Sequence, residues 1–377
     1  MKISITVSNS LKKDPRVIKQ VKCAIAAGHS VQFVGYRDQF FDKAFLNDLG
    51  CRVDIVDLGE KYVGHIPSLW GKIRRMYLRF VLPIRYICDF KPDVIHANDF
   101  DTLLFAYKAS RKTGAAIVYD SHEIFAENIG ITDNKWLKRF IIFNECRLVK
   151  KVDAMICVSH AAQSYFSNKY GVEPIVITNC PMLNNVPLRL KATDRFEVVY
   201  QGLIVKGRGY EEFVESATML GPDCRLVIRG YGSAEHGLHR IVEQKQLEDK
   251  VTFAEPVDVK ELISAASSSH VGVVLTRPVN INFQLSVSNK VFEYAHAGLP
   301  EILSDVAEHR YLNDRYNFAI ILPEVTPEAI AEAILRLKNN PTLYATLSNN
   351  AKRMSVETNW ENESMKLLDI YNRVYHG

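Results

Sequence analysis

The chain has 377 residues, a length that suits two domains of about 150–200 residues better than one hydrophobic core. Apolar residues make up 47% and charged residues 24% of it, a globular balance that excludes disorder, collagen-like repeats and a coiled coil. The net charge of +4 is too small to indicate a nucleic-acid partner, and no apolar run approaches the roughly 18–20 residues that span a bilayer.

The first half of the sequence alternates short apolar runs with helical patterns. We expect strands at residues 3–7, 30–34, 53–56, 94–96, 117–119 and 154–158. Helices are expected between them, for example at 15–27 and 136–151. This alternation predicts a parallel sheet with helices on both faces.

The second half repeats the alternation after an irregular stretch at 183–196, which we interpret as a linker. Strands are expected at 197–201, 225–229, 251–253, 271–275, 301–303 and 319–321, and helices at 210–220, 258–266, 290–297, 327–337 and 340–375. We therefore predict two doubly wound, Rossmann-like α/β domains, 1–182 and 183–358, that face each other across a ligand cleft. A C-terminal helix at 359–377 is expected to pack back toward the first domain.

Cysteine usage and the first residues bear on the cellular compartment. Seven cysteines are scattered without CxxC spacing, so neither a disulfide framework nor a cysteine-rich zinc site is expected. Residues 1–7 lack the apolar core and cleavage site of a secretory signal. These features favour a cytoplasmic protein with free thiols.

The segment 286–300 is the richest in chemical groups. Ser288 or Asn289 can cap a helix that carries Lys290 in its first turn. A helix N-terminus with a lysine suits an anion, and Glu293, one turn on, can accept two hydrogen bonds from a ribose diol. An ordinary capped amphipathic helix explains the same spacing equally well.

Two glycine-rich turns precede this helix in the chain. The stretch 200–209 follows a strand, opens a helix and contains Gly202, Arg208 and Gly209, so its backbone and guanidinium can approach a phosphate. It is neither a Walker A loop nor a GxGxxG fingerprint, and such loops also serve as simple strand–helix turns. A second turn of this form contains Arg229, Gly230, Tyr231 and Gly232.

The first half places polar residues after two predicted strands. His122 and Glu123 follow the strand 117–119, at the edge where doubly wound sheets bind ligands. A structural hydrogen-bonding histidine is the equally weighted alternative. Asp99 and Asp101 have the spacing of a DxD metal motif, but we favour a helix cap before Thr102, and no metal site is predicted.

A basic stretch at 70–86 allows two interpretations. It contains no acidic residue, and one helical face carries Trp70, Ile73, Tyr77, Phe80, Val81 and Ile84. The first interpretation is an anionic membrane surface as partner, contacted through Lys72, Arg74, Arg75 and Arg79. The second is a domain helix whose apolar face lies in the core and whose charges lie in water.

The order of these motifs resembles a retaining glycosyltransferase of the GT-B type, in glycosyltransferase family 4, also called glycosyl transferases group 1. The resemblance extends over essentially the whole chain. It is carried by residues 8–17, 27–31, 92–99, 118–123, 153, 158–159, 201–202, 208–209, 230–232 and 289–300.

This resemblance implies roles for the matching positions. Arg208 and Lys290 would neutralise the diphosphate of a UDP- or GDP-sugar, His122 would contact the transferred sugar, and Glu293 would bind the ribose. The stretches 229–233 and 253–257 would line the base pocket, with no cofactor or metal required. Further donor-binding residues implied are Gly202, Gly209, Arg229, Gly230, Tyr231, Gly232, Ser288 and Asn289. The implied acceptor-side or loop residues are Ser8, Asn9, Ser10, Asp14, Arg16 and Glu123, the loop 8–14 closing over phosphates and acceptor.

Two positions depart from the family pattern. Leu285 stands where the family often has a first glutamate, with seven residues between it and Glu293, and that glutamate normally contacts the sugar. Arg208 replaces the usual lysine, which keeps the charge and adds a planar fork.

The expected activity is hexosyl transfer to a hydroxyl of a glycan or lipid-linked acceptor with retention, in polysaccharide or glycolipid assembly. We expect a cytoplasmic enzyme, peripheral on the inner face of the membrane if the basic stretch contacts lipid. The alternatives are a nucleotide-sugar epimerase of the same architecture and a non-catalytic regulator that binds nucleotide-sugars. A nucleic-acid-binding protein is the weakest alternative, because no recognised motif supports it.

Overall fold

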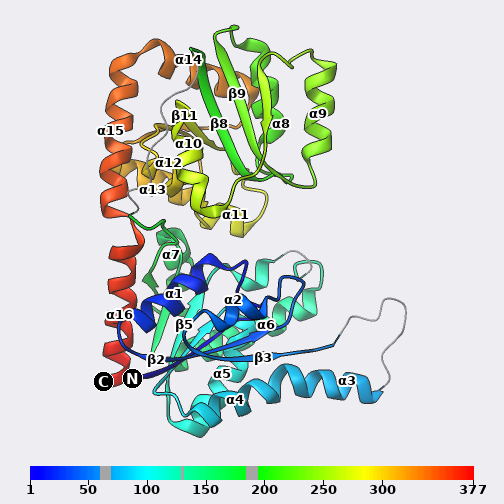
Figure 1. Ribbon diagram of the computed structural model, residues 1–377, viewed down its shortest axis with the longest axis vertical. Coiled ribbons are helices and arrows are strands. Elements are labelled where there is room, and N and C mark those ends of the chain that lie inside the picture. Colours follow the sequence, from blue (N-terminus) through cyan, green and yellow to red (C-terminus); the bar gives the residue numbers. More distant parts are fainter. Residues whose placement is uncertain (60–68, 129–130, 184–193) are drawn as a thin grey trace. The chain divides into compact units, whose positions relative to one another are not determined.

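The computed structural model describes residues 1–59, 69–128, 131–183 and 194–377 (Figure 1). The chain divides into two compact units, which are named here unit 1 (Met1–Ile177 with Ser364–Gly377) and unit 2 (Thr178–Glu363). Most of the expected linker, at 184–193, lies outside the described residues. Both chain ends belong to unit 1, since the last 14 residues, Ser364–Gly377, are part of it.

Unit 1 is built on a seven-stranded parallel sheet of order β3-β2-β1-β4-β5-β6-β7. The strands are β1 (Lys2–Thr6), β2 (Ser30–Tyr36), β3 (Arg52–Val56), β4 (Val94–Asn98), β5 (Ala116–Ser121), β6 (Ala154–Cys157) and β7 (Ile175–Val176). Six of them confirm the predicted strands. The seventh, β7, was not predicted, because two residues are too few to show a periodic pattern.

Helices and short helical turns connect the strands of unit 1. They are α1 (Pro15–Ala26), α2 (Lys43–Asn47), α3 (Leu69–Met76), η1 (Tyr77–Val81), α4 (Leu82–Phe90), α5 (Phe100–Thr113), η2 (Phe125–Glu127), α6 (Lys135–Leu148), η3 (Val149–Lys151), α7 (His160–Tyr170) and most of α16 (Trp360–His376). The start of α1 follows from local chemistry. Asp14 accepts a hydrogen bond from the N–H of Val17, and Pro15 has the backbone angle of a first helical residue.

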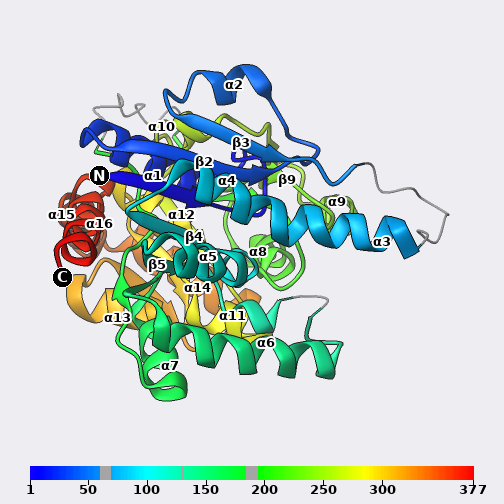
Figure 2. The same ribbon diagram turned by 90° about the horizontal axis from the view of Figure 1, so that it is seen from below.

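The basic stretch forms one continuous helical segment, in which the π-helical turn η1 joins α3 to α4 (Figures 1 and 2). The second interpretation of this stretch, an apolar face in the core, does not hold for α3, where Trp70 is 80% exposed. It is correct for α4, where Ile84 is only 7% exposed and Ile87 and Phe90 are also buried. The side chain of Lys72 lies outside the described part of the chain.

Unit 2 is built on a six-stranded parallel sheet of order β10-β9-β8-β11-β12-β13. All six strands confirm the predicted ones. They are β8 (Phe196–Leu203), β9 (Cys224–Tyr231), β10 (Val251–Ala254), β11 (Val271–Val274), β12 (Glu301–Ser304) and β13 (Ala319–Leu322). The helices and turns are α8 (Tyr210–Ser216), η4 (Ala217–Met219), α9 (Glu235–Gln244), η5 (Val259–Glu261), α10 (Leu262–Ser267), α11 (Ile281–Leu285), α12 (Asn289–His296), α13 (Ala307–Tyr316), α14 (Pro327–Asn339) and α15 (Pro341–Glu357).

The tail, predicted as helical from 340 to 375, is two helices, α15 and α16. Asn359 interrupts it: this residue is fully buried, and its side-chain oxygen accepts a hydrogen bond from the N–H of Asn362 at 2.9 Å. Asparagine at such a position starts a new helix rather than continuing the old one. No helix within the described residues is long and apolar enough to cross a membrane.

The core of unit 2 lies on both faces of its sheet. Val198 and Tyr200 of β8 belong to a buried cluster with Phe213 of α8, whereas Val199 belongs to a cluster with Tyr294 of α12. Alternate strand residues therefore feed opposite faces, as expected for a sheet covered on both sides.

Both sheets contain a point where the strand order reverses. In unit 1 it lies between β1 and β4, and in unit 2 between β8 and β11. Connections leave such a point in opposite directions, which opens a crevice at the carboxyl ends of the two strands. This predicts that ligand-binding residues follow β1, β4 and β5 in unit 1, and β8 and β11 in unit 2.

Candidate active site

A buried ion pair joins α1 to β5 in unit 1. Both carboxylate oxygens of Asp120, on β5, accept hydrogen bonds from Arg16 of α1, at 2.8 and 2.9 Å. Arg16 is 4% exposed and also donates to the carbonyl of Ile177 at 2.8 Å. Arg16 was expected among the acceptor-side loop residues. It lies inside the unit instead, because a fully buried carboxylate needs a counter-charge.

His122 follows β5 and faces an acceptor at each ring nitrogen. Its Nδ1 lies 3.4 Å from a carboxylate oxygen of Asp99, and its Nε2 lies 2.9 Å from Oδ1 of Asn98. The amide nitrogen of Asn98 donates to the carbonyl of Thr6 at 3.1 Å, so its oxygen is the atom that faces the imidazole. Acceptors on both sides favour the doubly protonated ring. Burial opposes this charge, but Asp99 and Asp120 outweigh burial and raise the pKa of His122 to about 9.

The role of Asp99 differs from the predicted helix cap. It stands directly before α5, but its side chain makes no capping hydrogen bond. With a φ of +61°, a conformation that aspartate tolerates, its carboxylate accepts the backbone N–H of His122 at 3.0 Å. Burial raises the pKa of Asp99 to about 7. Within the described residues, no group of three or more His, Cys, Asp or Glu side chains is arranged to hold a metal ion.

Replacing Asp99 by asparagine should lower the pKa of His122. Asp99 attracts the imidazole proton, so its loss should move the pKa down from about 9 toward the ordinary value of about 6.5. An NMR titration of the His122 ring measures this shift directly. Glu123→Gln is the matched control, because the Glu123 carboxylate accepts from Asn128. An unchanged titration in Asp99→Asn would contradict the assignment.

The loop between β1 and α1 is held by its own polar side chains. Asn9 donates to Asp14 at 3.0 Å and accepts from the N–H of Leu11 at 2.8 Å. The backbone N–H of Ser10 donates to Asp38, beyond β2, at 3.0 Å, and its hydroxyl donates to the other carboxylate oxygen. These bonds fix the loop 8–14 within unit 1, in front of the strand ends where the acceptor-side residues were expected.

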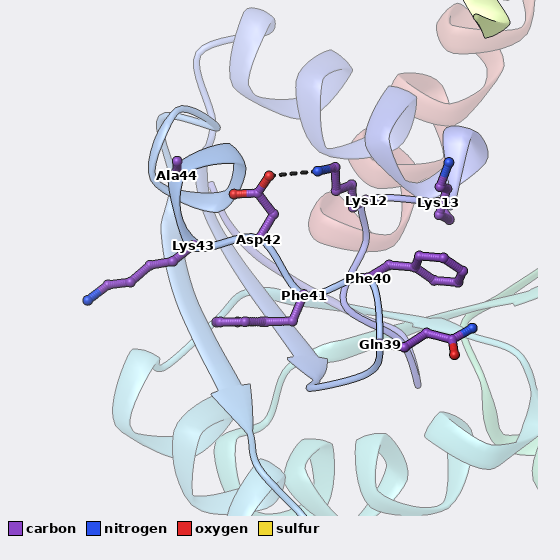
Figure 3. A pocket seen from close by; sticks show the side chains of 8 residues that line it. All are labelled: Lys12, Lys13, Gln39, Phe40, Phe41, Asp42, Lys43 and Ala44. Carbon is purple, nitrogen blue, oxygen red and sulfur yellow. Dashed lines mark hydrogen bonds and ion pairs between the residues drawn. The ribbon is translucent and has the colours of Figure 1, made fainter. Parts of the chain in front are cut away.

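A hollow of about 570 Å³ lies beside this loop, between Lys12 and Lys13 and the segment 39–44 (Figure 3). Lys12 pairs with Asp42 at 2.7 Å, and the ammonium of Lys13 lies 5.7 Å from the centre of the Phe40 ring. Gln39 and Phe40 also line a larger cavity on their other side, so the two hollows adjoin at this segment.

In unit 2, three glycines permit close approaches that a side chain would block. A Cβ at Gly202, where φ is +114°, would lie 2.8 Å from Nζ of Lys290, so the ammonium rests against the end of β8. A Cβ at Gly230 would lie 1.9 Å from the carbonyl oxygen of Gly202, and one at Gly232 would lie 2.1 Å from that of Ile204. Gly230 and Gly232 are therefore required by the packing of β9 against β8, and only Gly202 approaches a charged group.

Arg208 and Lys290 place two positive charges near the reversal point of unit 2. Arg208 donates to the hydroxyl of Thr276, just beyond β11, at 3.2 Å, and its guanidinium lies 4.4 Å from the centre of the Phe283 ring. Burial, together with the charge of Arg208, lowers the pKa of Lys290 to about 8, although Glu293 opposes this. A lowered lysine pKa marks a site where an added anion would be stabilised.

The helix α12 begins beside these cations without a side-chain cap. Ser288 stands at the capping position but makes no capping hydrogen bond, and Asn289 accepts from Asn179 at 3.3 Å. The prediction that one of them caps the helix is therefore wrong. Among the residues that the structure describes, no side chain caps this first turn, which is the arrangement of an anion site. Glu293, one turn on, accepts from Gln201 at 3.0 Å.

The remaining predicted donor residues lie on neighbouring strands. Arg229 of β9 is in register with Gln201 of β8, and Tyr231, at the end of β9, is 61% exposed. The stretch 253–257 begins in β10, which pairs with β9. Leu285, at the family's first glutamate position, ends the short helix α11.

Two family profiles match the chain in succession. Glycosyltransferase Family 4 matches residues 17–181, and Glycosyl transferases group 1 matches residues 187–354. The chain belongs to glycosyltransferase family 4. One curated relative, alpha-D-kanosaminyltransferase of Streptomyces kanamyceticus, is 28% identical over 162 residues. That match spans 42% of this chain and 40% of the relative.

Solved structures show the architecture of this glycosyltransferase. Anabaena HepE in complex with UDP and glucose matches with a TM-score of 0.77 at 14% identity, over 99% of this chain and 100% of HepE. Sucrose-phosphate synthase from Thermosynechococcus elongatus matches with a TM-score of 0.77 at 18% identity, over 100% of this chain and 99% of its own. The predicted GT-B fold is thereby confirmed.

The sequence did not indicate several residues that position the glycosyltransferase's charged groups. Thr276 and Phe283 hold Arg208, and Asn98 holds His122. Thr276 and Asn98 stand at the carboxyl ends of the two strands next to the reversal points, β11 and β4. The order of the strands within each sheet would have identified these two residues. A single sequence gives the order of the strands along the chain, but it does not show which strands are adjacent in the sheet.

Proposed function

We propose that this glycosyltransferase moves a hexosyl group from a UDP- or GDP-sugar to a hydroxyl of a glycan or lipid-linked acceptor, with retention of configuration. The observation that carries the proposal is the pair of cations, Arg208 and Lys290, beside the uncapped first turn of α12. Such a site suits a diphosphate. The structure of HepE with UDP and glucose supports a nucleotide-sugar donor by analogy.

The proposed mechanism rests on charge stabilisation. The bond between the anomeric carbon and the diphosphate oxygen breaks, and that oxygen takes both bonding electrons. Arg208, Lys290 and the N-terminus of α12 stabilise the charge that develops there. The acceptor oxygen attacks the face of the sugar from which the phosphate departs, so the configuration is retained. The proton of the acceptor hydroxyl passes to the departing phosphate oxygen. His122 contacts the transferred sugar, and Glu293 binds the ribose.

Thermal unfolding with UDP, GDP, ADP and dTDP tests the donor assignment. A nucleotide at 100 times its Kd stabilises the folded state by about 2.7 kcal/mol, which shifts the unfolding midpoint by several degrees. We expect a shift with UDP or GDP that Lys290→Ala abolishes. No shift with any nucleotide would contradict the proposal and favour the non-catalytic alternative. Sugar isomerisation without acceptor would favour the epimerase.

We also propose that unit 1 contacts an anionic membrane surface, in keeping with a role in cell-surface polysaccharide or glycolipid assembly. Exposed Trp70 and Ile73 lie next to Arg74 on α3, and α6 likewise exposes Trp136 and Phe140. Aromatic residues flanked by basic ones suit the lipid interface. Co-sedimentation with phosphatidylglycerol vesicles should fall in Trp70→Ala and in Arg74→Glu. Equal binding to phosphatidylcholine vesicles would contradict the charge argument.

A further inference from the structure

A cavity of about 1230 Å³ lies wholly within unit 1, at the carboxyl ends of its strands. Ser8 after β1, Tyr36 at the end of β2 and Asp101 in the first turn of α5 form part of its wall. Arg75 of α3 and Arg79 of η1 form another part. Residues near the end of β1 and two arginines of the basic helical segment therefore line the same cavity. Its volume admits a ligand larger than a single sugar.

The charges around this cavity are unevenly compensated. Arg37 pairs with Asp57 at 3.3 Å, and Asp38 accepts both hydrogen bonds of Ser10. Among the described residues, no carboxylate lies within ion-pair distance of the guanidinium of Arg75 or Arg79. Two guanidinium groups one helical turn apart and facing one cavity suit a phosphate or diphosphate group.

The same cavity offers a group suited to a sugar. The carboxyl group of Asp101 lies in the cavity wall, with its Oδ1 atom buried beneath the surface. Burial raises the pKa of Asp101, although a hydrogen bond from Ser8 and the charge of Arg79 oppose this. A carboxyl group in a cavity wall can accept a hydrogen bond from a sugar hydroxyl.

We propose that this cavity binds a glycosyl acceptor that carries a phosphate or diphosphate group, and that Arg75 and Arg79 hold that group. The proposal deepens the proposed function and rests on it, because it names the acceptor class of the same enzyme. It also separates the basic residues of the segment by role. All three side chains are exposed, but Arg75 and Arg79 line the cavity and Arg74 does not.

Calorimetric titration with farnesyl diphosphate tests the proposal. The titration is done in a Lys290→Ala background, so that the donor site does not compete for the diphosphate. We expect the further double substitution Arg75→Ala/Arg79→Ala to weaken binding at least tenfold. Arg85→Ala, an exposed arginine of the same helical segment that does not line the cavity, is the matched control and should change Kd less than twofold. Equal weakening by Arg85→Ala, or no effect of the double substitution, would overturn the proposal.

Two further measurements separate the possible outcomes. Inorganic pyrophosphate and farnesol, titrated in the same way, report the phosphate and the lipid separately. Binding of farnesol as tight as that of farnesyl diphosphate would overturn an anionic acceptor. Nucleotide-induced stabilisation of Arg75→Ala/Arg79→Ala with Lys290 intact shows whether the double variant is folded. Because the donor assignment is read from nucleotides and the acceptor assignment from farnesyl diphosphate, failure of one is distinguishable from failure of the other.

Discussion

Lys290→Ala should lower kcat by about two to three orders of magnitude, and Arg208→Ala should have a comparable effect, the range found when one charge-stabilising group is removed. Both side chains are already positioned, Arg208 by Thr276 and Phe283 and Lys290 by the absence of a side chain at Gly202. Positioned charges act on the developing charge of the leaving phosphate without reorganisation, so their removal raises the barrier. Steady-state kinetics with the donor identified by thermal shift provides the measurement.

The controls for this result distinguish a lost charge from a lost fold. Lys260→Ala, in the exposed turn η5, should leave kcat unchanged. Arg208→Lys keeps a cation and should lose less activity than Arg208→Ala, since the resemblance places a lysine at this position. A kcat within threefold of the unsubstituted enzyme for both alanine variants would contradict the role of these cations in the transition state.

The pH dependence of the donor site should follow from Lys290. Its pKa is lowered to about 8, chiefly by burial and then by the charge of Arg208. A bound diphosphate favours the charged form, so nucleotide binding should raise this pKa and take up protons near pH 8. Calorimetry measures this proton uptake as a heat of nucleotide binding that differs between buffers. Such a difference would link the pKa of Lys290 to donor binding.

Much of the fold could be predicted because the local patterns are strong and consistent. The strands β1 to β6 and β8 to β13 are short apolar runs between helices, and a parallel sheet follows from their alternation. The misjudged elements are those with weak local signals. β7 has two residues, and α3 exposes an apolar face for which the sequence left two interpretations open, a membrane surface and the core. Periodicity identifies an amphipathic helix but does not say what covers its apolar side.

The candidate site was predictable for charged residues near glycine-rich turns and less so for their partners. Lys290 and Glu293 were selected from the segment that contains them, and the structure places both on α12. The partners of His122 are the last residue of β4 and the residue after it, more than twenty positions away in the chain, and the position of Asp99 before a helix suggested a cap. Only the pairing of β4 with β5 brings Asn98 opposite Asp120 and next to His122.

The ion pair of Arg16 with Asp120 predicts the largest effect on stability. Arg16→Met should lower the free energy of unfolding by about 3–5 kcal/mol, because it removes the guanidinium that pairs with both oxygens of a buried carboxylate and leaves only the more distant His122. Burial raises the pKa of Asp120, but Arg16 and His122 outweigh it and hold that pKa well below its usual range. The pair therefore stabilises the fold above about pH 4, the ordinary carboxyl value, and this stability is lost as the pH falls toward the lowered one.

A double-substitution cycle, followed by urea denaturation, separates the pair from its surroundings. Arg16→Met/Asp120→Leu removes both charges, so it should be more stable than either single variant despite two changes in the core. Some loss should remain, because Gln20 donates to Asp120 at 2.6 Å and would then lack its acceptor. In Arg16→Met, the free energy of unfolding should fall less steeply as the pH drops below about 4. If the losses of the two single variants add and this pH dependence is unchanged, Arg16 contributes packing rather than charge. Another group would then keep Asp120 ionised beside His122.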